Sequence, residues 1–202
     1  MAKMGRPRSF DRDEAIQQAM HLFWRHGYES TSLSALTSAI GGGITPPSFY
    51  AAFGSKEGLF REVVELYVAT HGQVNASLWD KGLPPREAIE QALRRSARMQ
   101  TENSHPKGCL LVISAGACSP ENDRVQMALA EQRARTREGV LACVSRAVAA
   151  GELSAGTDAR SLAATINTFL LGLTTQARDG VPFETLNSAV TELMSVWDRH
   201  AA

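Results

Sequence analysis

The residues best suited to chemistry gather just before an apolar stretch in the middle of the chain. His105 and Cys109 lie four residues apart, and Cys118 follows nine residues later. Imidazole and thiolate are common zinc ligands, but this spacing matches no strong zinc signature. Ser104 and Lys107 have the Ser-x-x-Lys spacing of penicillin-binding enzymes, yet the companion Ser-Asp-Asn and Lys-Thr-Gly patterns are absent. We therefore expect neither a metal site nor any other cofactor.

Cys109 has a second candidate chemistry. It follows Lys107 and Gly108 at an expected helix start, where a nearby cation and the helix dipole favour the thiolate, so a redox or electrophile sensor is one interpretation. We favour the other interpretation, a small buried apolar side chain. The sequence has no Gly-x-Ser-x-Gly, no His-Glu-x-x-His, no phosphate loop and no dinucleotide fingerprint. The chain is therefore not expected to be an enzyme.

The composition is typical of a soluble globular protein. The chain has 202 residues, 44% of them hydrophobic and 21% charged, which suits one or two domains. Its apolar runs reach only five residues and its start has no signal-peptide core, so we expect a cytoplasmic protein with no membrane partner. The 21 basic and 21 acidic residues cancel, but Lys3, Arg6 and Arg8 form an amino-terminal arm without an acid. This arm either meets a nucleic acid or only aids solubility.

Three short helices are predicted within the first 54 residues, because apolar side chains recur there at steps of three and four. Each helix has a hydroxyl or carboxylate side chain before it and a glycine after it, which are ordinary start and stop signals. The expected caps are Asp11, the Ser30–Ser32 run and Thr45, and the expected ends are Gly27, Gly41–Gly43 and Gly54.

The rest of the chain is also predicted to be helical. Apolar periodicity predicts helices over residues 55–79, 86–100, 120–150, 158–178 and 183–199, and no segment alternates for long enough to be a strand. We expect an all-α protein of about nine helices, with a unit at residues 1–54 ahead of a larger helical unit at residues 55–202.

A specific signature runs through the three short helices. Its residues are Phe23-x3-Gly27-Tyr28-x2-Thr31-Ser32-Leu33-x2-Leu36, then Ile44-Thr45-Pro46-Pro47-Ser48-Phe49-Tyr50-x2-Phe53-x-Ser55-Lys56-Glu57-x-Leu59. This pattern resembles the helix-turn-helix domain of the TetR/AcrR family of transcriptional regulators. Residues 5–13 and 22–29 are most similar to its ComR-like branch. The specific resemblance covers residues 5–60, about a quarter of the chain.

The resemblance implies a double-stranded DNA partner with a palindromic operator. A recognition helix enters the major groove by its first turn, where short side chains permit close approach. The resemblance also implies phosphate contacts at Thr31, Tyr50 and Lys56, and basic arms reach along the backbone or into a minor groove. The candidate DNA-binding residues are Arg6, Arg8, Thr31, Ser32, Thr45, Pro46, Pro47, Ser48, Tyr50 and Lys56.

One feature departs from the family pattern. The turn before the third helix, Gly41–Gly43, is two residues longer than usual. Glycine tolerates positive φ but has more backbone freedom to lose on ordering. The longer turn bears on which operator sequence is read more than on whether DNA is bound.

The resemblance implies that residues 55–202 bind a small-molecule effector and form a homodimer, so that effector binding releases a repressor from its operator. Candidate effector contacts, taken from the apolar lining of the later helices, are Tyr67, Leu93, Met99, Cys109, Met127 and Phe169. In this family the last two helices form a four-helix bundle with the partner subunit. The candidate interface residues are therefore Leu162, Ile166, Leu173, Leu186, Val190, Leu193 and Trp197.

Two alternatives stay open. The neutral net charge also agrees with a helical ligand-binding or scaffolding protein that lacks DNA affinity. A repressor that senses oxidants or electrophiles through Cys109 is the other.

Overall fold

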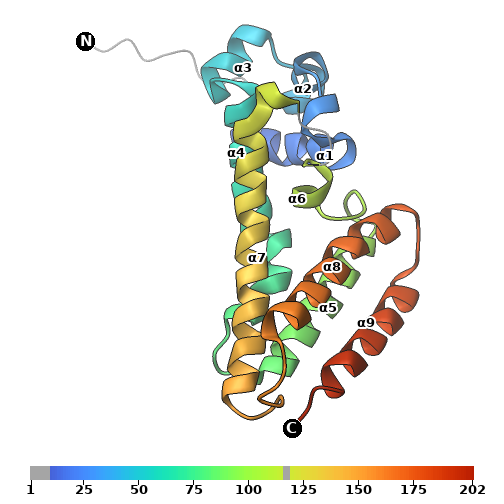
Figure 1. Cartoon of the computed structure of the whole chain (residues 1–202). Coiled ribbons are helices and arrows are strands. Elements are labelled where there is room, and N and C mark those ends of the chain that lie inside the picture. Colours follow the sequence, from blue (N-terminus) through green and yellow to red (C-terminus); the bar gives the residue numbers. More distant parts are fainter. Residues whose placement is uncertain (1–9, 116–118) are drawn as a thin grey trace.

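A computed structural model describes residues 10–115 and 119–202, and these ranges are helical almost throughout (Figure 1). They contain nine α-helices, three short 3-10 segments and no strand, which confirms the predicted fold class. The elements are α1 (Arg12–Ser30), α2 (Leu33–Ala39), η1 (Ile40–Gly42), α3 (Pro46–Phe53), α4 (Lys56–Ala69), η2 (His71–Trp79), α5 (Pro85–Thr101), α6 (Leu110–Ile113), η3 (Pro120–Asn122), α7 (Asp123–Ala149), α8 (Ala159–Arg178) and α9 (Phe183–Asp198).

Helices α1, α2 and α3 form a head at one end of the molecule, and their caps are those predicted from the sequence (Figure 1). The Asp11 carboxylate accepts hydrogen bonds from the first amides of α1, the Ser32 hydroxyl from an amide of α2, and the Thr45 hydroxyl from an amide of α3. These bonds satisfy donors that a helix start leaves unpaired.

The expected stop at Gly27 is found as a break in the helical dihedral angles, after which one short helical stretch follows. Gly27 has φ of 79° and kinks the chain, but helix α1 continues to Ser30. The Thr31 hydroxyl donates to the Gly27 carbonyl at 2.7 Å, which satisfies the acceptor exposed by the kink. A glycine thus bends this helix three residues before its end.

The Gly41–Gly43 turn packs against helix α1. All three glycines have positive φ, and the Gly41 amide donates to the Gln18 side chain at 2.8 Å. A Cβ atom on Gly41 would lie only 2.7 Å from the Phe10 Cβ atom. The long turn is therefore closely fitted at its first residue.

Helix α4 connects the head to the rest of the molecule. The predicted helix over residues 55–79 divides in two, because Thr70 leaves helical dihedral angles and the chain continues as the 3-10 segment η2. The Thr70 hydroxyl donates to the Leu66 carbonyl at 2.7 Å, and the Gln73 side chain donates to the Val68 carbonyl at 3.0 Å. These bonds satisfy carbonyls of the last turn of α4.

One apolar core joins the head to the helices beneath it. It includes Phe23 and Trp24 of α1, Phe60 and Tyr67 of α4, and Leu110 of α6. A second core lies between α5, α7, α8 and α9 at the other end of the molecule (Figure 1). Within the described ranges, no helix combines the length and the apolar character that crossing a bilayer requires.

Candidate DNA interface and interior cavity

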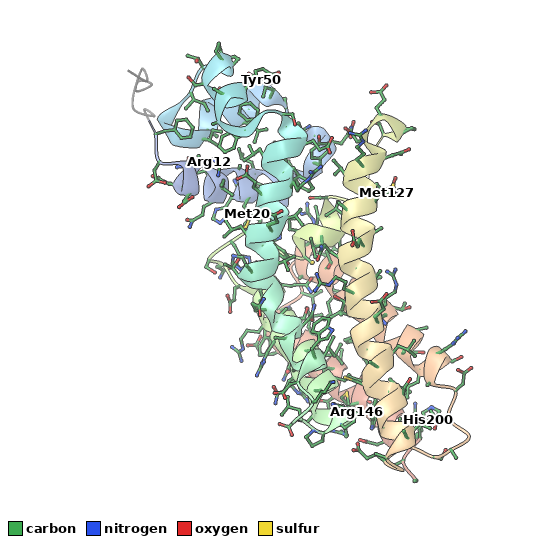
Figure 2. All side chains as sticks on the ribbon, turned by 90° about the vertical axis from the view of Figure 1, so that its left-hand side faces the viewer. Arg12, Met20, Tyr50, Met127, Arg146 and His200 are labelled. Carbon is green, nitrogen blue, oxygen red and sulfur yellow. The ribbon has the colours of Figure 1, made fainter. Side chains whose placement is uncertain are left out.

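The first turn of α3 presents small side chains to solvent at the tip of the head. Thr45, Pro46 and Pro47 are exposed, Ser48 is half-buried and Tyr50 is 50% exposed; we call these five residues the α3 face. Figure 2 shows Tyr50 at the far end of the head.

Buried aromatic rings and a local cap fix the orientation of the α3 face. Phe49 is fully buried and Phe53 nearly so, with ring centroids 5.4 Å apart. The Thr45 and Ser48 hydroxyls lie 3.0 Å apart, and the Thr45 hydroxyl also accepts the Ser48 amide. Helix α3 therefore exposes hydroxyls and proline rings on a rigid element, with room for a close macromolecular surface.

Thr31 lies inside the head and does not face solvent. Its exposed fraction is 1%, its hydroxyl donates to the Gly27 carbonyl, and its amide donates to the Tyr28 carbonyl. A phosphate cannot reach a buried hydroxyl, so the prediction that Thr31 contacts DNA is corrected to a structural role in this conformation. The neighbouring Ser32 is exposed and caps α2 at the Ala35 amide.

Lys56 starts α4 beside the head. Its ammonium nitrogen lies 4.3 Å from the centroid of the Tyr28 ring, within the range of a cation–π contact. Tyr28 in turn stacks on Phe23 and meets the edge of Phe60. The charge of Lys56 is thus held near the core of the head. The predicted contacts Arg6 and Arg8 lie outside the described residues.

A cavity of about 320 Å³ that is open to solvent on one side lies between α4, η2, α5, α6 and α7, and we call it the interior cavity. Three of the six predicted effector contacts line it: Tyr67, Met99 and Cys109. A smaller hollow of about 50 Å³ shares Cys109 with it and extends toward α8. The volume of the larger space is at the lower end of the range for small-molecule sites.

The other three predicted contacts do not line either space. Leu93 is 1% exposed and belongs to the second core, where Phe169 packs as a partly buried neighbour. Met127 is 70% exposed, near the end of α7 closest to the head (Figure 2). The structure does not bring these three residues to either space, because apolar periodicity identifies an apolar face but does not tell whether it meets a cavity, a packed core or solvent.

Sequence reasoning missed the polar part of the lining. Asn75 of η2 and Gln132, Arg135 and Thr136 of α7 all border the larger space. The Asn75 Oδ1 atom is buried and accepts no hydrogen bond from any described residue. No sequence signal could have identified these residues, since a polar side chain facing a cavity has the same periodicity as one facing water.

Cys109 borders both spaces. The Tyr67 hydroxyl donates to its sulfur at 3.3 Å. Burial raises the pKa of the Cys109 thiol above its ordinary value, although the Tyr67 bond opposes this shift. The expected stabilisation of the thiolate by a nearby cation and a helix dipole is therefore outweighed by desolvation.

His105 packs as an aromatic side chain. Its Nδ1 lies 3.0 Å from the Pro106 carbonyl, and its ring stacks on the Trp24 indole with centroids 4.4 Å apart. Among the described residues, no three histidine, cysteine or acidic side chains converge as metal ligands do. Cys118, the third member of the candidate metal motif, lies outside those residues.

Aromatic contacts connect the cavity directly to the head. Tyr67 meets the edge of Trp24 of α1 with centroids 4.9 Å apart, while its hydroxyl reaches Cys109 at the cavity wall. The Trp24 indole also donates to the Gly108 carbonyl at 3.0 Å, next to Cys109. The cavity-lining side chain Tyr67 is therefore in direct contact with α1.

The seven predicted interface residues are buried within their own chain. Their exposed fractions range from 0% for Val190 to 9% for Leu193. They pack in the cores between α5, α7, α8 and α9, so their assignment to a subunit interface is corrected. The apolar faces of α8 and α9 do pack against other helices as predicted, but those helices belong to the same subunit. The corrected residues are Leu162, Ile166, Leu173, Leu186, Val190, Leu193 and Trp197.

The opposite side of α8 is exposed and uncharged. No charged residue lies between Arg160 and Arg178 of α8. Thr168 and Gly172 are exposed there, together with Leu171 at 40% exposure. An uncharged helix face with small side chains allows a neighbouring helix to approach closely.

Comparisons with known proteins agree on one family. The family model described as bacterial regulatory proteins, tetR family, matches residues 15–63, and that described as tetracyclin repressor-like, C-terminal domain, matches residues 85–180. The HTH-type transcriptional repressor ComR of Escherichia coli (strain K12) is 31% identical over 194 residues, which cover 96% of this chain and 91% of that protein.

Solved structures give the same result. A cysteine mutant of the TetR family transcriptional regulator CifR, complexed with 26bp double-strand operator DNA, is 43% identical with a TM-score of 0.86 and covers 95% of this chain and all of that one. A putative TetR transcriptional regulator from Rhodococcus sp. RHA1 is 37% identical with a TM-score of 0.59, over 90% of this chain and 96% of that one.

Proposed function

The chain belongs to the TetR family and is a transcriptional repressor, and we propose that it works as a homodimer that leaves a palindromic operator when a small molecule fills the interior cavity. The proposal assigns DNA binding to residues 1–54 and effector binding and dimerisation to residues 55–202.

The observation that carries this proposal is the exposed first turn of α3. Thr45, Pro46, Pro47 and Ser48 are small enough for the turn to enter a major groove and meet base edges, with their orientation set by buried Phe49. Lys56, Tyr50 and Ser32 then contact phosphates on either side, with Arg6 and Arg8 extending the contact. The CifR complexes, at 43% identity, contain operator DNA and therefore support DNA binding by this chain.

Dimerisation is proposed through the outward face of α8. Its uncharged stretch around Thr168, Leu171 and Gly172 can pack against the same face of a second copy without burying an unpaired charge. A twofold dimer of this kind holds two α3 helices at a fixed separation, which suits half-sites about one DNA turn apart.

Release is proposed to act through the cavity wall. Tyr67 contacts both Cys109 and Trp24, so a ligand that displaces Tyr67 also changes the packing of α1 on α4. A ligand that binds one arrangement of the heads more tightly than the other shifts the population toward it. Operator affinity then falls as the cavity fills.

Selection of bound sites from random DNA duplexes, followed by sequencing, tests the proposal. We expect enrichment of a palindrome with fixed half-site spacing, and a gel shift that weakens steeply with salt. No enrichment together with no shift at low salt would support the scaffolding alternative instead.

The dimer has its own test. A Thr168→Arg variant places a charge on the outward face of α8 and is expected to be monomeric by light scattering coupled to size-exclusion chromatography. Met127→Arg is the matched control, because Met127 is already 70% exposed on another helix. A dimeric Thr168→Arg variant would place the interface elsewhere.

Thiol sensing by Cys109 is a second candidate, favoured by its position on both hollows beside the Tyr67 hydroxyl. Addition of the Cys109 thiol to the C=C bond of a maleimide would form a carbon–sulfur bond and break the C=C π bond, and the adjacent carbon would take up the proton that the thiol loses. Treatment with N-ethylmaleimide, intact mass measurement and a Cys109→Ser control test it. A Cys109 thiol that stays unmodified in the native protein while the protein still responds to an effector would exclude this candidate.

A further inference from the structure

The walls of the interior cavity lack negative charge. No aspartate or glutamate from the described residues lines the larger space or the smaller hollow beside it. A cationic ligand would therefore leave water without a counter-ion, which is costly in a partly enclosed site. The absence of acids indicates a ligand that is neutral or negative.

Positive charge is present on one wall. Arg135 borders the larger space and Arg137 the smaller one. Both residues are exposed, at the solvent side of these spaces, and neither forms a salt bridge within the described part of the chain. Arg133 borders the smaller hollow and donates to the carbonyl of Leu111, which lines both spaces, at 2.7 Å. A planar guanidinium suits a carboxylate, because it can donate two parallel hydrogen bonds.

A polar atom of the η2 side chain Asn75, which lines the same space, lacks a partner among the described residues. The Asn75 Oδ1 atom is buried and accepts no hydrogen bond from the described residues. An unpaired buried acceptor is destabilising, so a donor from a ligand would stabilise the occupied state. The ligand is therefore expected to carry a hydroxyl or N–H group as well.

The remaining walls and the volume limit the body of the ligand. Tyr67, Trp79 and Met99 give the cavity an apolar side suited to an aromatic ring or short alkyl chain. The volume of about 320 Å³ equals that of about ten water molecules, so about ten non-hydrogen atoms fit.

We infer that the effector of this repressor is a small hydroxylated organic acid: its carboxylate pairs with Arg135, its hydroxyl donates to Asn75 Oδ1, and its apolar body packs on Tyr67, Trp79 and Met99. This inference rests on the proposed function, because it assumes that the interior cavity is the effector site. It adds the chemical class of the ligand and the residues that select it.

Isothermal titration calorimetry of the full chain without DNA tests this class. The probes are 4-hydroxybenzoate, 4-hydroxybenzamide and 4-hydroxybenzylamine, which share one ring and one hydroxyl but are negative, neutral and positive. We expect the acid to bind about tenfold or more tightly than the amine, with the amide between them. Equal affinities for acid and amine, or binding by none of the three, would overturn the inference.

Two variants assign the contacts. Arg135→Gln is expected to remove the preference for the acid over the amide, whereas the control Arg95→Gln, at an exposed arginine of α5 outside both linings, leaves it unchanged. Asn75→Leu is expected to remove the advantage of 4-hydroxybenzoate over benzoate. An unchanged preference in either cavity variant would overturn the corresponding contact.

These measurements separate the inference from the proposed function. Binding is measured without DNA, and operator binding is measured by gel shift without any probe. Operator binding with no acid preference overturns only the ligand class, whereas acid preference without operator binding overturns only the DNA-binding proposal.

Discussion

The α3 face takes all its side chains from residues 45–50, whereas the walls of the interior cavity come from residues 67–136. The first is positioned by a local cap and by two buried rings of the same helix. The second exists only where five elements, separated by loops, pack around an unfilled space. A short sequence signature can therefore specify the α3 face, but no short signature can specify the cavity.

The same contrast predicts how each region responds to substitution. The α3 face depends on a small core, so a single core substitution should abolish DNA binding. The cavity has walls from many elements, so single changes there should alter ligand response and leave DNA binding intact.

The largest effect is expected from Phe49→Ala. Phe49 is fully buried, and loss of a buried phenylalanine costs about 3–5 kcal/mol of unfolding free energy. Thermal unfolding and a gel shift should show a lower melting temperature and no operator binding. The cavity-wall control Trp79→Leu, at a residue that is 52% exposed, should keep operator binding. Loss of operator binding in both variants would contradict the claim that the two regions respond differently to substitution.

The glycine turn gives the next effect through a matched pair. Gly41→Ala and Gly42→Ala both place alanine at positive φ, which costs about 1–2 kcal/mol each. Only the Gly41 Cβ would also meet Phe10, at 2.7 Å, whereas nothing lies within 4 Å at Gly42. Chemical denaturation should therefore show that the unfolding free energy of Gly41→Ala is lower than that of Gly42→Ala by about 1 kcal/mol. Equal losses would mean that Phe10 moves aside freely.

Within the DNA interface, phosphate and base contacts should separate. Lys56→Ala is expected to weaken binding to all sequences and to reduce the salt slope by about 1, and Tyr50→Phe to weaken binding uniformly but by less. Pro47→Ala and Ser48→Ala should instead change the preferred sequence. Gel shifts over a salt series with two operator sequences measure both effects, and uniform weakening by all four variants would contradict the division.

The smallest effect is expected from the histidines where the head meets the cavity. Burial, then the charge of nearby His105, lowers the pKa of both His21 and His71, while Glu102 opposes the shift at His71. The unfolded chain then binds more protons than the folded one as pH falls below about 6.5. Stability should decrease from that pH downward and level off below the lowered pKa values.

Melting temperatures measured from pH 8 to pH 5 test this pH dependence. His71→Gln should reduce the loss of melting temperature toward acid pH. His200→Gln, which changes a histidine away from His21, His71 and His105, should leave that loss unchanged. A slope that is the same in both variants would show that other groups cause it.

Helix propensity and capping made the fold predictable from sequence. Asp11, Ser32 and Thr45 cap helices where expected, and α5, α8 and α9 begin and end within about two residues of their predicted limits. These features depend on neighbouring residues in the chain.

Local patterns gave wrong results where the outcome depended on distant partners. Thr31 has a cap-like sequence context, but the kink at Gly27 turns its hydroxyl inward. Met127 and Phe169 are both apolar residues on long helices, yet one faces solvent and the other packs on a core.

The sequence by itself determined the helical fold, the family and the composition of the α3 face, because caps, glycine ends and the helix-turn-helix signature act over a few residues. Only the tertiary structure decided that the α8–α9 seam is buried within one chain, that the outward side of α8 is free of charge and exposed, and that Asn75 and Arg135 share a cavity with Cys109. The physical reason is that burial is a property of the packed neighbours of a side chain, and periodicity records only that a side chain prefers to be buried.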